Sequence, residues 1–311
     1  MRAVVFAYHD VGCRGLDVLA RLGVDIALVY THDDDPAEDT WFGSVRATCA
    51  RLGVHTAVGA DPNAPHEVER IRALAPDALF SFYFRDLLRR PVLDTAKHGG
   101  FNLHGSLLPR YRGRAPVNWQ ILHGEREGGV TLHHMVERAD AGDIVDQEAF
   151  VIGPDDTPTA VYARLVEAGA RVLERSAPDC LRGEARRVLQ LESKATKFGR
   201  RRPDDGRIDF RHSADDVRNL VRAVTRPYPG AFAFAGERRV AVWWAEHAGR
   251  SPHERDAPGT VRRVGSDALV ACADGRSLRL VDVEVDGVEP GAVSEFLRDG
   301  LVLTGQPRGG R

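Results

Sequence analysis

Residues 101–140 constrain the fold of this chain more than any other stretch. A short apolar run carries Asn102 and His104 two residues apart, so a strand here would point both side chains to one face. The next segment, 106–116, is rich in Pro, Gly and Arg and is predicted to be an ordered loop. A second apolar run, 129–135, leads to Asp140 and a turn. We therefore expect an amide, an imidazole and a carboxylate to converge at strand ends, where open α/β sheets place their chemistry.

These three groups suit acyl transfer. An Asn NH₂ group and an imidazolium N–H can both donate to an oxyanion that develops on a carbonyl. A His side chain can also pass a proton to a leaving nitrogen, because its pKa lies near neutrality. A nearby Asp can keep the His charged or accept a proton from an attacking amine. This stretch places no Ser or Cys as a covalent nucleophile, so direct attack by a substrate amine is the simpler interpretation.

The rest of the first 200 residues alternates apolar runs with helical stretches, a pattern typical of a doubly wound α/β domain. Strands are predicted at 2–8, 25–31, 54–58, 77–83, 98–105, 129–135 and 144–152, and helices at 16–22, 44–52, 65–75, 116–123 and 157–180. Gly12 and Gly15 lie in a predicted turn, 9–15. This turn lacks the G-x-G-x-x-G dinucleotide fingerprint, so no NAD site is expected.

A polar, Pro-containing segment at 197–205 predicts a domain boundary, which gives one domain at 1–200 and a second at 205–305. In the second domain we expect a short strand at 207–211 and a helix that Ser213 caps and that runs to Thr225. Short β runs separated by turns follow between 231 and 284. This pattern predicts a small β-barrel.

Composition narrows the function classes. The 311 residues carry a formal net charge of only −2, so nothing marks the chain as a nucleic-acid binder. The four cysteines are scattered without CxxC spacing, which indicates reduced thiols rather than a zinc knuckle or a disulfide framework. No signal peptide opens the chain, and no apolar run approaches the span of a bilayer. We therefore expect a cytoplasmic protein without membrane insertion, and the sequence leaves a homo-oligomer open.

No metal site is expected. The carboxylates at 33–35 are consecutive and lack the alternating spacing of a calcium loop, so this stretch is predicted to be a solvated acidic loop. His133 and His134 are adjacent in a predicted strand and must point to opposite faces, which excludes a paired metal site from these two side chains.

The central motif resembles the folate-dependent formyltransferases. It reads Asn102-Leu103-His104-Gly105-Ser106-Leu107-Leu108-Pro109, continues with Arg112-Gly113 and Pro116, and ends with Asp140-Ala141-Gly142. The resemblance implies a Rossmann-like N-terminal formyltransferase domain with a smaller β-rich, OB-like C-terminal domain. It also implies that 10-formyltetrahydrofolate is the co-substrate and that an amine accepts the formyl group.

Within this family, two segments are similar to the enzymes that formylate UDP-4-amino-4-deoxy-L-arabinose in lipid A modification and polymyxin resistance. These segments are VVFAYHD at 4–10 and FGRR at 198–201. The resemblance therefore implies a UDP-amino sugar as the substrate. The bifunctional members of this group continue into an NAD-dependent decarboxylase domain, which this sequence lacks, so we expect a stand-alone formyltransferase or a separated domain.

The resemblance also assigns roles to individual residues. Asn102 stabilises the oxyanion, His104 donates a proton toward the leaving nitrogen, and Asp140 tunes His104. Folate is expected to contact Asp86, Leu87, Leu88, Arg114, Val136, Glu137, Arg138, Ala139 and Asp140. The UDP-amino sugar is expected to contact Tyr8, His9, Gly12, Arg200, Arg201 and Arg202. Arg110 and Arg112 also suit a diphosphate or a folate glutamate tail, because guanidinium groups bind planar oxyanions through two hydrogen bonds.

Several alternatives stay open at this point. A methionyl-tRNA formyltransferase shares the motif and the two-domain layout. Binding of tRNA is nevertheless not favoured, because acidic and basic residues are nearly balanced in the second domain and Trp243 and Trp244 are adjacent rather than part of a basic groove. Another nucleotide amino sugar could be the acceptor. A folate-dependent hydrolase would release formate with the same Asn and His. A non-catalytic folate or nucleotide binder would leave Asn102, His104 and Asp140 idle.

Overall fold

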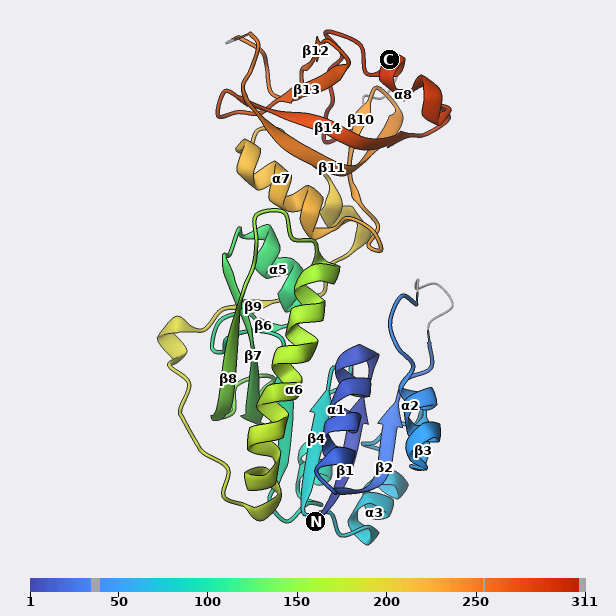
Figure 1. The fold of residues 1–311 in the computed structure, drawn as a ribbon, viewed down its shortest axis with the longest axis vertical. Coiled ribbons are helices and arrows are strands. Elements are labelled where there is room, and N and C mark those ends of the chain that lie inside the picture. The colour runs from blue at the N-terminus through green and yellow to red at the C-terminus, as the bar shows by residue number, and fades with distance from the viewer. Residues whose placement is uncertain (35–39, 254, 308–311) are drawn as a thin grey trace. The chain divides into compact units, whose positions relative to one another are not determined.

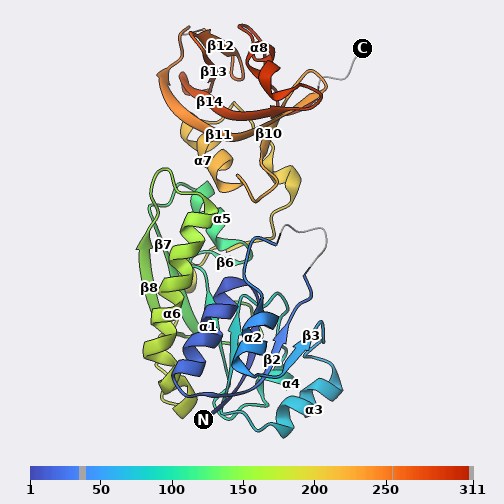
Figure 2. The ribbon, with the colours of Figure 1, turned by 45° about the vertical axis from the view of Figure 1, so that its right-hand side comes forward.

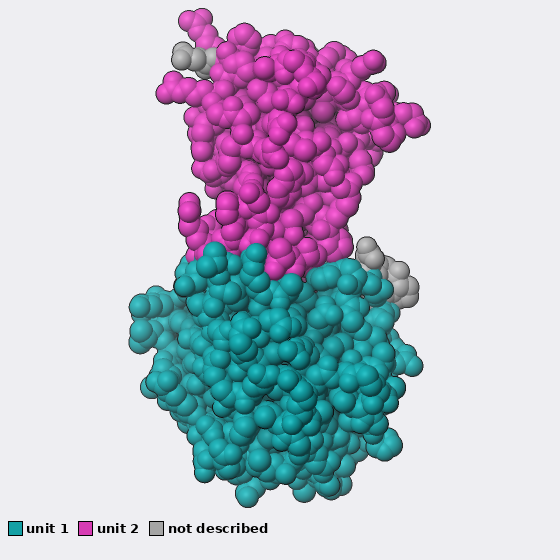
Figure 3. All heavy atoms as spheres, viewed as in Figure 1, with its two compact units in different colours: residues 1–116, 127–151, 162–199 teal, residues 117–126, 152–161, 200–311 magenta. Residues whose placement is uncertain are grey.

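The structure is a computed structural model that describes residues 1–34, 40–253 and 255–307. The chain divides into two compact units, coloured separately in Figure 3. Unit 1 contains residues 1–116, 127–151 and 162–199, and unit 2 contains residues 117–126, 152–161 and 200–311. Two stretches of the first 200 residues thus cluster with the C-terminal part of the chain. Residues 35–39 of the predicted acidic loop, Asp35 of the weighed carboxylates among them, lie outside the described residues.

Unit 1 is built on a seven-stranded sheet with the order β3-β2-β1-β4-β5-β7-β8. Its strands are β1 (Arg2–Ala7), β2 (Asp25–Thr31), β3 (Thr56–Val58), β4 (Ala78–Phe82), β5 (Gly100–His104), β7 (Glu127–His134) and β8 (Ile144–Val151). The first five strands of this order are parallel, whereas β7 and β8 pair antiparallel. The carboxyl ends of β1, β4 and β5 therefore share one edge of the sheet. This arrangement confirms the predicted α/β fold.

Helices cover both faces of this sheet. They are α1 (His9–Arg21), α2 (Val45–Leu52), α3 (Pro65–Ala73), α4 (Arg90–Leu93) and α6 (Pro158–Arg182), and α5 (Pro116–Leu122) begins at the unit boundary. On one face α1 and α6 lie side by side (Figures 1 and 2), linked by the ion pairs Arg14–Glu167 and Arg21–Glu174. On the other face, alternate residues of β1 join an apolar cluster with α3 and α4. Residues 3–7 of β1 are all buried, and successive side chains point to opposite faces, so β1 anchors a helix layer on each side.

The predicted turn at 9–15 is wrong, because α1 begins at His9 directly after β1. Gly12 and Gly15 are packing positions in this helix and not loop residues. A Cβ atom on Gly15 would lie 2.6 Å from the ring of Phe82, and one on Gly12 would lie 3.0 Å from the Cβ atom of Ala7. These glycines let α1 approach the sheet closely, so the sequence that indicated a turn encodes a helix–sheet contact.

Unit 2 contains α7 (Ala214–Ala223) and a five-stranded antiparallel sheet with the order β10-β11-β14-β13-β12. Its strands are β10 (Ala231–Ala235), β11 (Arg238–Arg250), β12 (Val261–Val264), β13 (Asp267–Ala271) and β14 (Arg276–Val285). Phe234 bridges to Thr304 and Thr260 bridges to Val302, so residues 302–304 contact both edges of the sheet. The sheet is thereby closed, as the predicted small barrel requires.

Short elements complete the fold. They are β6 (Arg112–Gly113), which pairs with β9 (Lys197–Phe198), the 3₁₀ helices Glu192–Lys194, Pro203–Gly206 and Pro290–Ala292, and α8 (Val293–Phe296). The predicted strand at 207–211 is wrong, because only a single bridge between Arg207 and Phe232 forms there. The predicted cap is present, since Ser213 Oγ accepts the Asp216 N–H at 3.1 Å. Among the described residues, no helix has the length and apolar character needed to span a membrane.

Candidate active site

Strands β5 and β7 bring an amide and an imidazole together. Asn102 is paired in register with His133, and cross-strand partners project to the same face. The Nδ1 atom of His133 lies 2.9 Å from the His134 carbonyl oxygen, so Nδ1 carries the ring hydrogen and Nε2 is an acceptor. Asn102 Nδ2 lies 3.1 Å from His133 Nε2 and donates one N–H to it. This hydrogen bond fixes the orientation of the Asn102 amide.

Asp140 lies at the centre of the cluster. Its Oδ1 atom is 3.5 Å from His104 Nδ1, 3.6 Å from His133 Nε2 and 3.5 Å from Asn102 Nδ2. Its Oδ2 atom accepts the Gly113 N–H at 2.8 Å. The backbone of Asp140 has a φ of 55°, in the left-handed region that non-glycine residues rarely occupy and that is enriched at functional sites. Of the three predicted catalytic side chains, Asn102 and His104 therefore both lie against the carboxylate of the third, Asp140.

Both ring nitrogens of His104 have an oxygen acceptor near them. Its Nε2 atom lies 2.8 Å from the Tyr111 carbonyl oxygen, and its Nδ1 atom faces Asp140. Both neighbours are acceptors, so only a doubly protonated ring can donate to both. Burial raises the pKa of Asp140, but the His104 ring and the Gly113 N–H lower it more, and the net pKa lies well below the usual range of Asp. The site thus holds a carboxylate beside the His104 ring.

Gln190 stabilises the turn that carries Asp140. Gln190 Nε2 donates to the carbonyl oxygens of Asp140 at 2.9 Å and Gly142 at 2.6 Å. A Cβ atom on Gly142 would lie 1.9 Å from the His134 carbonyl oxygen, so only glycine fits there. Arg112, predicted as an anion ligand, is buried instead. Its guanidinium donates to Gln190 Oε1 at 2.7 Å and pairs with Glu192 at 2.8 Å, so this residue supports the turn.

The predicted folate segments form two loops with unused backbone groups. The backbone N–H groups of 86–88 and of 136–137 have no hydrogen-bond partner among the residues that the structure describes. Leu87 is 64% exposed and Val136 is 47% exposed, although both are apolar. Leu88 is buried, and Met135 packs against the apolar cluster to which Leu88 belongs. The two loops therefore meet on one apolar base and present polar backbone edges beside exposed apolar side chains.

The remaining predicted folate residues lie around these loops. Arg114 donates to the Arg85 carbonyl oxygen at 2.8 Å, which ties it to the 86–88 loop. Arg138 pairs with Glu192 at 2.8 Å, Glu137 is exposed and Ala139 is half-buried.

The predicted sugar-nucleotide residues of unit 1 lie at the carboxyl end of β1. Tyr8 is buried, and its hydroxyl donates to Asp34 at 3.1 Å. His9 has a φ of 63° and stacks on Phe42 with ring centroids 3.4 Å apart. Burial and the nearby Arg85 lower the pKa of His9 to about 3, so its ring is neutral. Gly12 is buried within α1.

Arg200, Arg201 and Arg202 belong to unit 2. Arg201 is half-buried, and its guanidinium lies 4.8 Å from the centre of the Trp119 ring while it donates to the Asp205 carbonyl oxygen. Arg200 and Arg202 are exposed, and the backbone N–H of Arg202 donates to the Asp205 side chain. Of these three arginines, Arg201 has its guanidinium fixed by contacts with Trp119 and Asp205.

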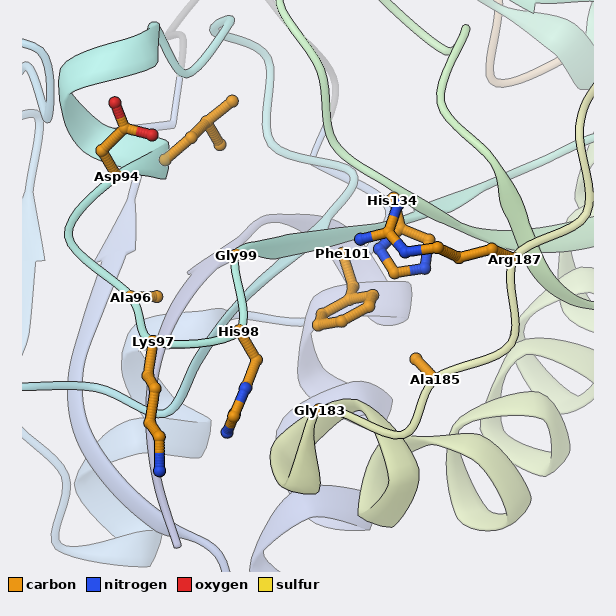
Figure 4. Close-up of a pocket in the computed structure, with 11 residues that line it drawn as sticks. Asp94, Ala96, Lys97, His98, Gly99, Phe101, His134, Gly183, Ala185 and Arg187 are labelled. Carbon is orange, nitrogen blue, oxygen red and sulfur yellow. The ribbon is translucent and has the colours of Figure 1, made fainter.

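A cavity of about 450 Å³ lies at the opposite edge of the same sheet, beside the amino end of β5. Figure 4 shows Phe101, His134 and Arg187 on one side of it and Lys97 and His98 on another. The predicted catalytic side chains do not line it. Within residues 1–34, 40–253 and 255–307, no group of three or more His, Cys, Asp or Glu side chains is arranged to hold a metal ion.

Sequence reasoning missed His133 and Gln190. The signal for His133 was present, since it lies on a predicted strand beside the one that carries Asn102. Its place opposite Asn102 depends on the antiparallel register of β5 and β7, which the sequence does not reveal. Gln190 acts across 50 residues of sequence, and no local pattern marks it.

Two stretches of the chain match known protein domain families. Residues 17–176 match the formyl transferase family, and residues 201–300 match the formyl transferase C-terminal domain.

Three solved structures share the fold at low sequence identity. WlaRD, a sugar 3N-formyltransferase solved with dTDP and 5-N-formyl-THF, is 17% identical with a TM-score of 0.69 over 93% of this chain and 99% of that chain. The N-formyltransferase of Helicobacter canadensis, solved with folinic acid and dTDP-3-aminofucose, is 18% identical with a TM-score of 0.68 over 90% and 98%. HypX of Aquifex aeolicus, in complex with tetrahydrofolic acid, is 18% identical with a TM-score of 0.60 over 90% and 43%.

Proposed function

This chain belongs to the formyl transferase family, and we propose that it transfers a formyl group from 10-formyltetrahydrofolate to the amino group of a nucleotide-linked sugar. The first choice of acceptor is UDP-4-amino-4-deoxy-L-arabinose, with a role in lipid A modification. The observation that carries the proposal is the convergence of Asn102, His104 and Asp140 beside two loops with free backbone groups.

The chemistry follows from the polar contacts. The neutral amine attacks the formyl carbon, the carbonyl oxygen becomes an oxyanion, and the bond to the folate nitrogen then breaks. Asn102 donates one amide N–H to His133 at 3.1 Å and the other, over 3.5 Å, to Asp140, and this long second hydrogen bond is the one that the oxyanion would replace. His104 gives a proton to the leaving nitrogen, and Asp140 accepts, directly or through water, the proton that the amine loses. Protons therefore balance, and no covalent enzyme intermediate forms.

The folate proposal rests on the chemistry of the two loops. A pterin ring has both hydrogen-bond donors and acceptors along its edge and two apolar faces. Free backbone groups at 86–88 and 136–137 can pair with such an edge, while Leu87 and Val136 offer apolar contact. Both WlaRD and the H. canadensis enzyme were solved with formylated folates, which supports the same class of co-substrate here.

The acceptor proposal rests on the cluster of Tyr8 and His9 at the carboxyl end of β1 in unit 1. A second candidate acceptor is a dTDP-linked amino sugar, because WlaRD and the H. canadensis enzyme were solved with dTDP or a dTDP-sugar. Both candidates share a nucleoside diphosphate and a primary amine, so they differ only in base and sugar.

Mass spectrometry tests the proposal. The purified protein receives 10-formyltetrahydrofolate and, in separate reactions, UDP-4-amino-4-deoxy-L-arabinose, dTDP-3-aminofucose or methionyl-tRNA. We expect one formyl group to be added to the UDP-sugar. Formylation of the dTDP-sugar alone would select the second candidate, and formylation of the tRNA alone would reject both. Release of formate without an acceptor would identify a hydrolase.

A further inference from the structure

The loop between β4 and α4, residues 83–89, is held at two points by side chains from outside it. His32 contacts its first half, and Asn63 contacts its second half. The free backbone N–H groups of 86–88 lie between these two points.

His32 follows β2 and contacts three consecutive residues of this loop. Its Nε2 atom accepts the Arg85 N–H at 3.0 Å, and its ring stacks on Phe84 with centroids 4.2 Å apart at 21°. Because Nε2 accepts, the ring hydrogen lies on Nδ1, which is 4.0 Å from the Asp86 carboxylate. A neutral ring therefore satisfies every one of these contacts.

The surroundings hold this ring in place. Tyr8 packs edge-to-face on His32 with centroids 5.3 Å apart, and the Tyr8 hydroxyl is bonded to Asp34. The Arg85 guanidinium lies 4.7 Å from the centre of the Tyr8 ring, and the Arg85 carbonyl accepts from Arg114. The His32 side chain is only 18% exposed. Displacing it would break contacts to two predicted ligand segments at once.

Asn63 holds the other end of the loop through both ends of its amide. Its Nδ2 donates to the Leu87 carbonyl oxygen at 3.0 Å, and its Oδ1 accepts the Arg89 N–H at 2.8 Å. Asp61 fixes the amide in turn, because Asp61 Oδ1 accepts from Asn63 Nδ2 at 3.2 Å.

We propose that His32 and Asn63 are positioning residues that preorganise the 83–89 loop for the folate co-substrate. This inference rests on the proposed function. A loop that is already in its binding conformation loses less conformational entropy on binding, so these residues contribute to folate affinity without touching the folate. Neither has contact with Asn102, His104 or Asp140, so turnover at saturating folate is independent of them.

The contacts of His32 also make this affinity depend on pH. Burial lowers the pKa of His32 below the ordinary value of 6.5, and Arg85 and Arg114 lower it further against the opposing effect of Asp86. Tyr8 and its partner Asp34 are the other titratable groups beside the ring. Protonation places a hydrogen on Nε2, which can then no longer accept the Arg85 N–H. Folate affinity therefore falls as the pH drops through the lowered pKa of His32.

The test measures folinic acid binding by calorimetry between about pH 5.5 and pH 8. His32→Phe keeps the stacking on Phe84 but removes the acceptor, and we expect its Kd to rise about 5- to 10-fold at neutral pH. His32→Gln offers an amide oxygen that does not titrate, so its Kd is expected to be nearly flat with pH. Asn63→Ala should raise Kd similarly with the wild-type pH dependence. His66→Phe, at a side chain that is 79% exposed, is the matched control.

The outcomes separate this inference from the function on which it rests. If the wild type binds folinic acid and His32→Phe binds it equally well, or only melts at a lower temperature, the positioning role is overturned. The same acid weakening in His32→Gln as in the wild type would overturn the assignment of the pH dependence to His32. If the wild type does not bind folinic acid, the folate proposal itself fails.

Discussion

His133 and His134 are adjacent on β7, and their environments show how differently the two sides of this strand are used. His133 accepts from Asn102 and faces Asp140. His134 packs on Phe101 with centroids 4.9 Å apart, donates to the Arg186 carbonyl oxygen and lines the 450 Å³ cavity (Figure 4). Both rings are almost fully buried, so burial alone does not distinguish them.

The difference lies in convergence. On the His133 side, an amide, two imidazoles and a backbone N–H all meet one carboxylate. On the His134 side, the charged groups are dispersed, and the Arg187 guanidinium is paired with Asp143 at 3.3 Å. The cavity lies on the His134 side of β7, and the converging polar groups lie on the His133 side. Volume is thus a poor guide to chemistry in this sheet, whereas convergent polar groups with a shifted pKa are a good one.

The largest expected effect separates the two sides directly. Asn102→Ala and His104→Ala should each lower turnover by about 10²- to 10³-fold, because each removes a donor to the reacting atoms. Steady-state kinetics with 10-formyltetrahydrofolate and the accepted amino sugar measure the effect, and circular dichroism checks folding. Activity like that of the wild type in either variant would show that the altered side chain is not catalytic.

A smaller effect is expected from the two neighbours on β7. His133→Phe removes the acceptor that orients Asn102, and we expect about a 10-fold loss in turnover. His134→Phe keeps a ring against Phe101 and should leave turnover unchanged while it lowers the free energy of unfolding by about 1 kcal/mol. Equal turnover in the two variants would contradict the distinction between the two faces.

The free energy of unfolding should depend on pH through His9, at the carboxyl end of β1. His9 has a pKa of about 3 in the folded protein against 6.5 for an ordinary histidine. Its neutral form is thus favoured by folding, so its contribution is present above pH 6.5 and is lost as the pH falls toward 3. Urea unfolding of the wild type and of His9→Phe across this range should diverge. Parallel curves would show that His9 titrates as an exposed residue does.

The smallest effect is expected in the cavity. Lys97→Ala and Arg187→Ala should change turnover by less than about 2-fold, since exposed ion pairs such as Arg187–Asp143 contribute little. The same kinetic assay measures this. A loss comparable to that of His133→Phe would show that the cavity side takes part in the chemistry after all.

Local patterns predicted most of the fold and the three central side chains. The period-2 alternation at Asn102 and His104 and the prolines and glycines after them are readable without knowledge of contacts. The start of α1 was mispredicted because a glycine indicates a turn and a close helix–sheet contact equally well. Arg112 was mispredicted because its burial depends on Gln190 and Glu192, which lie about eighty residues away. Register and long-range contacts are the information that a single sequence lacks.

The closure of the C-terminal sheet has a consequence for the integrity of the protein. Residues 302–304 bridge to Phe234 of β10 and to Thr260, the residue before β12, so these few residues cover two strand edges together. Proteolysis just before residue 302 would expose both edges at once, and open strand edges are templates for pairing between molecules. Such a nicked chain is expected to form aggregates under conditions in which the intact protein stays dispersed. The bridges of residues 302–304 would then protect the folded protein from aggregation through its strand edges.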